Sequence, residues 1–157
     1  MHKYKYKKYF LLVVILLGLT LTKSLAQTKQ LPITLQMYKM EKHLVLVFAP
    51  TAANAQWQKQ QQFLKQAATE MTTRDLVALG ILETQVRSSE PAAGILPSAK
   101  ALRQHYQVNP TAFEVILIGK DGGEKYRTQD VINPSKIFQI IDSMPMRQQE
   151  IRQGLRH

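Results

Sequence analysis

The residues best placed to do chemistry follow an apolar run at residues 44–48, where a polar loop leads directly into a helix. Open α/β sheets favour ligand sites beyond the carboxyl ends of their strands, and a helix start offers unpaired amides to an anion. Thr51, Asn54 and Gln56 could contribute polar contacts to such a site. The alternative is structural, with Asn54 as the cap of the helix and Trp57 packed in the core. Both interpretations stay open at the level of sequence.

The chain offers no activated nucleophile for covalent catalysis. It contains no cysteine, which excludes thiolate chemistry, and no serine lies in a Gly-x-Ser-x-Gly turn, although a triad built from distant residues stays open. The four histidines, at positions 2, 43, 105 and 157, lack the paired spacing of metal ligands. We therefore expect no catalytic residue, no metal site and no cofactor. We expect His43, His105 and His157 at the surface or at the edges of elements.

A second candidate contact surface lies near the end of the chain, where residues 144–147 read MPMR. Proline ends or kinks a helix, and methionines beside a kink can form an adaptable contact surface. Met144 continues the apolar stripe of the preceding helix, whereas Met146 and Arg147 lie beyond it. These two residues are candidate partner contacts, and a purely structural role for them is the open alternative.

The first 26 residues have the pattern of a secretory signal peptide. Four lysines precede an apolar stretch at residues 10–21, and Ser24 and Ala26 supply small residues before the predicted cleavage between Ala26 and Gln27. The alternative is an uncleaved anchor, but a spanning helix needs about 20 apolar residues. We therefore expect a periplasmic or secreted protein with no stable membrane span after cleavage.

The charge of the chain restricts its partners. The formal net charge is +10, but five of the 21 basic residues and none of the 11 acidic ones precede residue 27, which leaves +5 for residues 27–157. The basic residues are scattered, apart from a group near the end of the chain. We expect an unidentified protein or an anionic envelope component as partner, and no nucleic acid.

Apolar runs that alternate with helical patterns predict one α/β domain at residues 44–157, after a lead-in segment at 27–43. Short continuous apolar runs suit strands covered on both faces, and apolar residues at helical spacing after Asn or Ser caps suit helices. In the lead-in, Leu35, Tyr38 and Met40 should pack against the domain. The expected strands are 44–48, 76–82, 115–118 and 125–128, and the expected helices are 55–73, 98–106 and 133–144, with a loop at 88–97 and a loosely held helical segment at 146–155.

These elements predict a three-layer α/β sandwich with the order β-α-β-α-β-β-α. Parallel pairs of strands separated by helices come first, and a hairpin with a closing helix follows. The turn of the hairpin is Asp121-Gly122-Gly123, because glycine tolerates the positive φ of tight turns.

Three stretches carry a resemblance to a known family: residues 46–50 (LVFAP), 117–123 (LIGKDGG) and 141–147 (IDSMPMR). With the order of elements, they resemble the family of exported thioredoxin/peroxiredoxin-like domains of unknown function, which occur in bacterial secreted proteins and beside sushi repeats in animal extracellular proteins. The resemblance implies a thioredoxin-like fold. The chain departs from the wider superfamily, because Ala52 and Ala55 lie about where a redox pair would sit and Pro110 lies too early for the redox proline.

Thiol–disulfide exchange and peroxide reduction both need a thiolate, so neither can follow the usual route here. The sequence therefore favours a redox-inert binding or interaction module. The alternative is an enzyme with a non-cysteine site at residues 51–57, acting on envelope or peroxide-type substrates.

Overall fold

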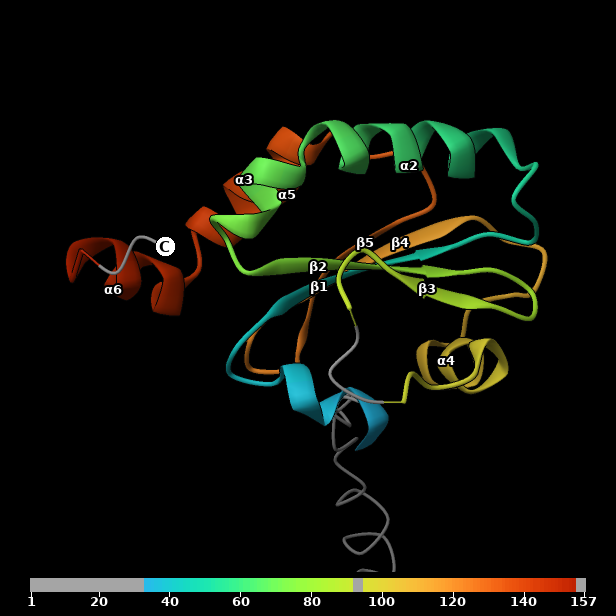
Figure 1. Ribbon diagram of the computed structural model, residues 1–157, viewed down its shortest axis with the longest axis horizontal. Helices are drawn as coiled ribbons and strands as arrows, with labels where there is room; N and C mark the ends of the chain where they lie inside the picture. Colours follow the sequence, from blue (N-terminus) through green and yellow to red (C-terminus); the bar gives the residue numbers. More distant parts are fainter. Residues whose placement is uncertain (1–32, 92–94, 155–157) are drawn as a thin grey trace, which may run out of the picture.

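A mixed five-stranded sheet lies at the centre of the computed structural model, which describes residues 33–91 and 95–154 (Figure 1). The strands are β1 (His43–Phe48), β2 (Leu76–Ile81), β3 (Val86–Ser88), β4 (Glu114–Ile118) and β5 (Glu124–Thr128). Their spatial order is β3-β2-β1-β4-β5. The predicted signal peptide and its cleavage site at Ala26 and Gln27 lie outside the described residues.

The direction of β4 differs from the expected one. β1 and β2 are parallel, with Val45 opposite Ala78, but β4 runs antiparallel to β1, with Val45 opposite Leu117. The reason is β3, which occupies part of the expected 88–97 loop and the residues just before it. β3 is antiparallel to β2 and reverses the chain, so the following crossover delivers β4 in the direction of β3.

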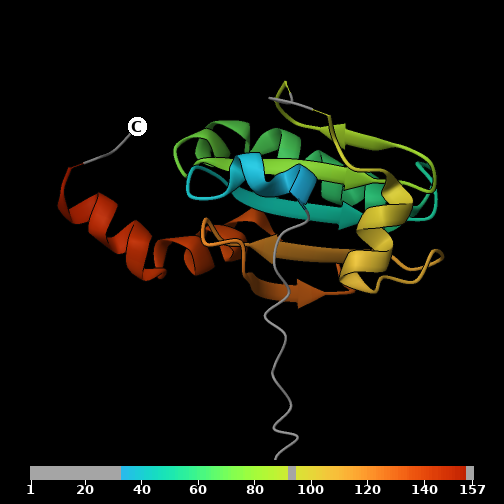
Figure 2. The same cartoon turned by 90° about the horizontal axis from the view of Figure 1, so that it is seen from below.

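Helices cover both faces of the sheet, as the expected three-layer sandwich requires (Figures 1 and 2). One face carries α2 (Ala55–Gln66), α3 (Ala68–Thr72) and α5 (Pro134–Asp142). The other face carries the 3₁₀ helix η1 (Ile33–Tyr38) and α4 (Ala99–Tyr106). The last helix, α6 (Pro145–Arg152), extends beyond the sheet rather than over it.

The central strands are buried on both faces because their side chains alternate between two cores. Leu44, Leu46 and Phe48 of β1 join the core beneath η1 and α4. Val45 and Val47 point the other way, into the core beneath α2 and α5. All six residues of β1 and of β2 are buried, as the apolar runs predict.

The predicted helix starts are confirmed by their caps. Asn54 accepts from the amide of Trp57 at 2.9 Å, Ser98 accepts from that of Ala101 at 3.2 Å, and Asn133 caps α5. The helix expected at 55–73 is instead two helices, because Ala67 leaves the helical region with ψ at 16°. The break lets both α2 and α3 bury an apolar side chain against the sheet.

The lead-in packs as expected at two of its three positions. Leu35 and Tyr38 are buried beneath the sheet, but Met40 is 60% exposed. Met40 adopts a φ of 69° in the turn before β1, which directs the chain into the strand. The expectation that Met40 packs against the domain is therefore wrong.

The fold prediction concerns Gly80, the residue of β2 over which Trp57 packs. A Cβ at Gly80 would lie 2.4 Å from Cη2 of the Trp57 ring. We expect Gly80→Ala to lower the free energy of unfolding by about 1–3 kcal/mol, because a well-packed core resists added volume. Urea unfolding measures the loss.

Trp57→Leu supplies the control, since it removes the ring that the new methyl group would meet. In that background Gly80→Ala should cost much less, in a double-mutant cycle. An equal cost in both backgrounds would show that the ring does not limit position 80.

Candidate functional site

The loop after β1 holds the three residues predicted as ligand contacts, and two of them already have partners within the chain. Asn54 caps α2, and Nε2 of Gln56 donates to the carbonyl oxygen of Gln129 at 3.0 Å. Thr51 lies exposed at the tip of the loop. The loop thus presents Thr51 and surface alanines to solvent, while Asn54 and Gln56 hold it in place.

Arg103 occupies the space behind this loop, at the carboxyl ends of the two parallel strands. Its Nη2 donates to the carbonyl oxygens of Ala49 at 2.7 Å and Ile81 at 3.4 Å, and its Nη1 donates to that of Asn109 at 3.0 Å. The guanidinium carbon lies 5.5 Å from the centre of the Phe48 ring, within range of a cation–π contact. One side chain therefore joins the ends of β1 and β2 to the segment between α4 and β4.

Arg103 is 6% exposed, which is unusual for a charged side chain. Burial lowers the pKa of its guanidinium, and Glu83 acts in the opposite direction. Within the described residues no carboxylate lies within 4.0 Å of it, and its buried Nε has no hydrogen-bond partner. An arginine stays charged under such conditions, so the site holds a buried cation that contacts no carboxylate of the described residues directly, with Glu83 acting on it from beyond 4.0 Å.

Sequence reasoning missed Arg103, although the helix contains a signal for it. Arg103 lies four residues after Ala99 and three before Tyr106, and residues at these spacings share one face of a helix. Ala99 and Tyr106 are both buried. A charged residue between two buried ones on a single face indicates a buried charge, and therefore a candidate functional residue.

A groove of about 650 Å³ lies alongside Arg103. We call it the α4 groove, and its wall is mostly apolar. The residues that line it include Thr84 after β2, Ser98 and Lys100 at the start of α4, Arg103, and Val108 and Pro110 after α4. Its volume falls in the range of small-molecule sites, about 300–1,000 Å³.

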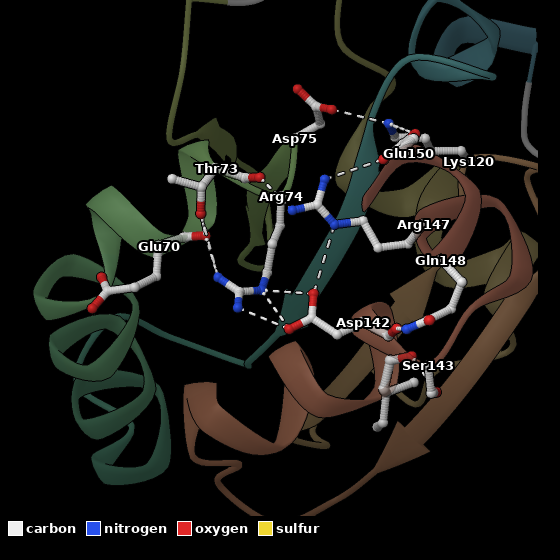
Figure 3. A network of polar contacts seen from close by, with 11 residues as sticks. Glu70, Thr73, Arg74, Asp75, Lys120, Asp142, Ser143, Arg147, Gln148 and Glu150 are labelled. Carbon is white, nitrogen blue, oxygen red and sulfur yellow. Dashed lines mark hydrogen bonds and ion pairs between the residues drawn. The ribbon is translucent and has the colours of Figure 1, made fainter. Parts of the chain in front are cut away.

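The opposite edge of the sheet carries a network of ion pairs (Figure 3). Nζ of Lys120, which is 7% exposed, lies 2.9 Å from Oδ2 of Asp75 and 2.7 Å from Oε1 of Glu150. Nη2 of Arg74 lies 2.8 Å from Oδ2 of Asp142. With Arg147, the network contains three cations and three carboxylates, so it is electrically balanced.

This network contains Arg147, one of the two candidate partner contacts on α6. Its side chain is buried, and it donates to the carbonyl oxygen of Thr73 at 2.9 Å and to Oε2 of Glu150 at 3.1 Å. Arg147 and Glu150 therefore hold α6 to the domain. Met146 is 36% exposed and remains available to a partner.

His43 lies beside the network and begins β1, so it stands at the edge of an element, one of the two expected positions, and at 2% exposure it is buried there rather than at the surface. It lines a cavity of about 310 Å³ together with Lys120, Met144 and Met146. Burial, and then the charge of Lys120, lowers the pKa of His43 from 6.5 to about 4. The imidazole is therefore neutral at pH 7.

Two geometric features thus characterise the described part of the chain: a buried cation without a direct carboxylate contact at one edge of the five-stranded sheet and a balanced network at the other. Residues 34–150 match the model of a family described as "Domain of unknown function (DUF4174)". The chain belongs to the DUF4174 family. This membership confirms the resemblance seen in the three sequence stretches.

The relatives of this DUF4174 chain include longer proteins. The rat sushi repeat-containing protein SRPX is 28% identical over 122 residues, which cover 74% of this chain and 26% of that protein. The zebrafish coiled-coil domain-containing protein 80 is 23% identical over 133 residues, which cover 74% of this chain and 15% of that protein. The chain thus spans about a quarter or less of the length of these relatives.

Solved structures confirm the fold. The thioredoxin peroxidase I of Plasmodium yoelii superposes with a TM-score of 0.54 at 17% identity, covering 73% of this chain and 79% of that one. The reduced 2-Cys peroxiredoxin of Plasmodium vivax superposes with a TM-score of 0.52 at 19% identity, covering 73% and 84%. The DUF4174 chain therefore has a thioredoxin-like α/β fold, and it has this fold without a cysteine.

His43, beside the network of ion pairs, should make the stability of the domain depend on pH. The unfolded chain takes up a proton at His43 near pH 6.5, whereas the folded chain does so only near pH 4. Between these values the unfolded state binds more protons, so stability falls as the pH falls. We expect a loss of about 2 kcal/mol in the free energy of unfolding between pH 7 and pH 5, measured by urea unfolding.

His43→Gln should remove most of this dependence, because glutamine does not titrate. Burial tends to raise the pKa of Glu150, but hydrogen bonds from Lys120 and Arg147 outweigh it and hold that pKa below its usual value. Its stabilisation is therefore lost at lower pH, below about pH 4.5, in both proteins. An unchanged slope between pH 7 and pH 5 in His43→Gln would contradict the assignment to His43.

Proposed function

We propose that this chain is an exported, redox-inert binding module of thioredoxin-like fold. The observation that carries the proposal is the edge of the sheet behind the loop after β1. There the chain has a buried arginine and an open groove, and it has no thiol anywhere in its sequence. A preformed groove with a fixed charge supports binding, whereas turnover would need a nucleophile or an acid–base pair.

The geometry of the loop supports the same conclusion. Asn54 and Gln56 are engaged in capping and in bridging to Gln129, so neither is positioned to activate the exposed Thr51 hydroxyl. Within the described parts of the chain, no group of three or more histidine and acidic side chains is arranged to hold a metal ion. The enzyme alternative, at residues 51–57, therefore depends on Thr51 without an adjacent base.

Export is supported by the N-terminal pattern and by the resemblance to domains of extracellular sushi-repeat proteins. In residues 33–91 and 95–154, every helix is too short or too polar to cross a bilayer. The net charge of +5 after residue 26 supports an anionic envelope component or a protein as partner rather than nucleic acid. Met146 on α6 is a further proposed contact for a protein partner.

Redox inertness gives the direct test of this function. The purified, metal-stripped protein should neither reduce insulin disulfides nor consume peroxide above the buffer rate, because no residue can form a mixed disulfide or a sulfenic acid. Spectrophotometric assays of both reactions measure this. Saturable turnover that is lost in Thr51→Ala or Asn54→Ala would instead establish the enzyme alternative.

Export gives a second test. We expect cleavage after Ala26, because Ser24 and Ala26 are small and the apolar stretch is short. Intact-mass spectrometry of the protein from its native host should find a chain that begins at Gln27. A chain that still carries residues 1–26 would mean an anchored protein.

A further inference from the structure

We propose that the α4 groove binds an organic carboxylate with an apolar body, such as a medium-chain fatty acid. The carboxylate would lie near Arg103 and Lys100 at the start of α4, and the apolar body would lie along Val108 and Pro110. This inference rests on the proposed binding function and names the chemical class of its ligand.

The buried cations of the chain differ in their carboxylate partners. Three lysines or arginines are buried within the described residues: Lys120, Arg147 and Arg103. Lys120 has two carboxylate partners within 4.0 Å, and Arg147 has carboxylate partners in Asp142 and Glu150. Among the described residues, Arg103 contacts carbonyl oxygens and the Phe48 ring and has no carboxylate within 4.0 Å. The chain thus pairs its buried cations directly with carboxylates at one edge of the sheet and leaves one without such a contact at the other.

Burying the charge of Arg103 carries a desolvation cost. Removing a charge from water costs several kcal/mol, and carbonyl dipoles compensate only part of this cost. Nε of Arg103 is also a buried donor without a hydrogen-bond partner among the described residues, a property that it shares with Nε of Arg147. In surroundings of low dielectric constant the positive potential of Arg103 extends into the groove, where an anion would be stabilised.

The wall of the groove combines positive charge with apolar surface. Lys100 is exposed at its rim, and the first turn of α4 adds the positive end of a helix dipole. Glu83 also lines the groove and opposes an anion; it is exposed like Lys100, so water and salt screen both side chains and the buried Arg103 is the least screened charge. Because the rest of the wall is mostly apolar, a ligand with both an anionic head and a hydrocarbon body fits better than a fully hydrated anion.

The test is isothermal titration calorimetry of the purified protein at pH 7 with octanoate, 1-octanol and acetate. We expect saturable binding of octanoate, at least about tenfold tighter than that of octanol, which lacks the charge, or acetate, which lacks the body. Equal affinities for octanoate and octanol would overturn the proposal, and so would the absence of saturable octanoate binding.

Two variants locate the site without depending on a change in the buried residue. Lys100→Glu reverses an exposed charge on the groove and should weaken octanoate binding about tenfold, whereas Lys136→Glu changes an equally exposed lysine on α5, across the sheet, and should not. Arg103→Lys should weaken binding further if the variant melts cooperatively. Equal effects of Lys100→Glu and Lys136→Glu would overturn the assignment to this groove.

The outcomes distinguish this inference from the function on which it rests. Failure of octanoate to bind would remove the carboxylate as ligand, while a redox-inert chain would still act as a binding module for another partner. Sustained peroxide or disulfide turnover would overturn the proposed function itself, whatever octanoate does.

Discussion

The proposed binding edge of the sheet depends on the hydrogen bonds that the guanidinium of Arg103 donates. The guanidinium joins Ala49 and Ile81, the residues at the ends of the two parallel strands, to Asn109 beyond α4. A cation in this position would stabilise a thiolate on the adjacent loop, because positive charge lowers the pKa of a thiol. The chain has this cation and a thioredoxin-like fold, but its sequence contains no cysteine.

The buried cations at the two edges of the sheet differ in their partners. At the edge where the parallel strands begin, Lys120 and Arg147 each meet carboxylates, and the result is a network that holds α6 to the domain. A buried cation with its counter-ions is a structural device, since removing either partner would leave an unpaired charge. At the opposite edge, no carboxylate of the described residues lies within 4.0 Å of Arg103, and Glu83 acts on it only from a greater distance. This difference is the reason for assigning structure to the first edge and binding to the second.

The sequence was sufficient to predict the central strands, because residues 44–48, 76–82 and 115–118 form apolar runs that only a doubly covered sheet explains. It was also sufficient for the helix starts, since Asn54, Ser98 and Asn133 are capping residues in front of periodic segments. β3 has three residues that are not fully buried, and it therefore leaves no periodic signal. Missing β3 also meant missing the reversal that makes β4 antiparallel.

The candidate site was harder to predict than the fold. Asn54 caps α2, one of the two roles that the sequence leaves open for it, but Arg103 contacts residues 22 and 54 positions away, and no local pattern encodes those contacts. The same holds for Lys120 and Glu150, which are 30 positions apart and lie in the β4–β5 turn and on α6. Local spacing can place a residue on a buried face, whereas only the folded chain shows which carbonyls or carboxylates meet it there.

We propose that the carboxyl edge of the sheet is a binding site built around a buried arginine. The most direct measurement is a ¹H–¹⁵N correlation spectrum of the protein during titration with octanoate, including the Nε–Hε signal of Arg103. We expect chemical-shift changes that grow to saturation at Arg103, at the start of α4 and after β2, while the signals of the β4–β5 turn and α6 stay unchanged. Shifts confined to α6 and the cavity beside His43, or spread evenly over the surface, would contradict it.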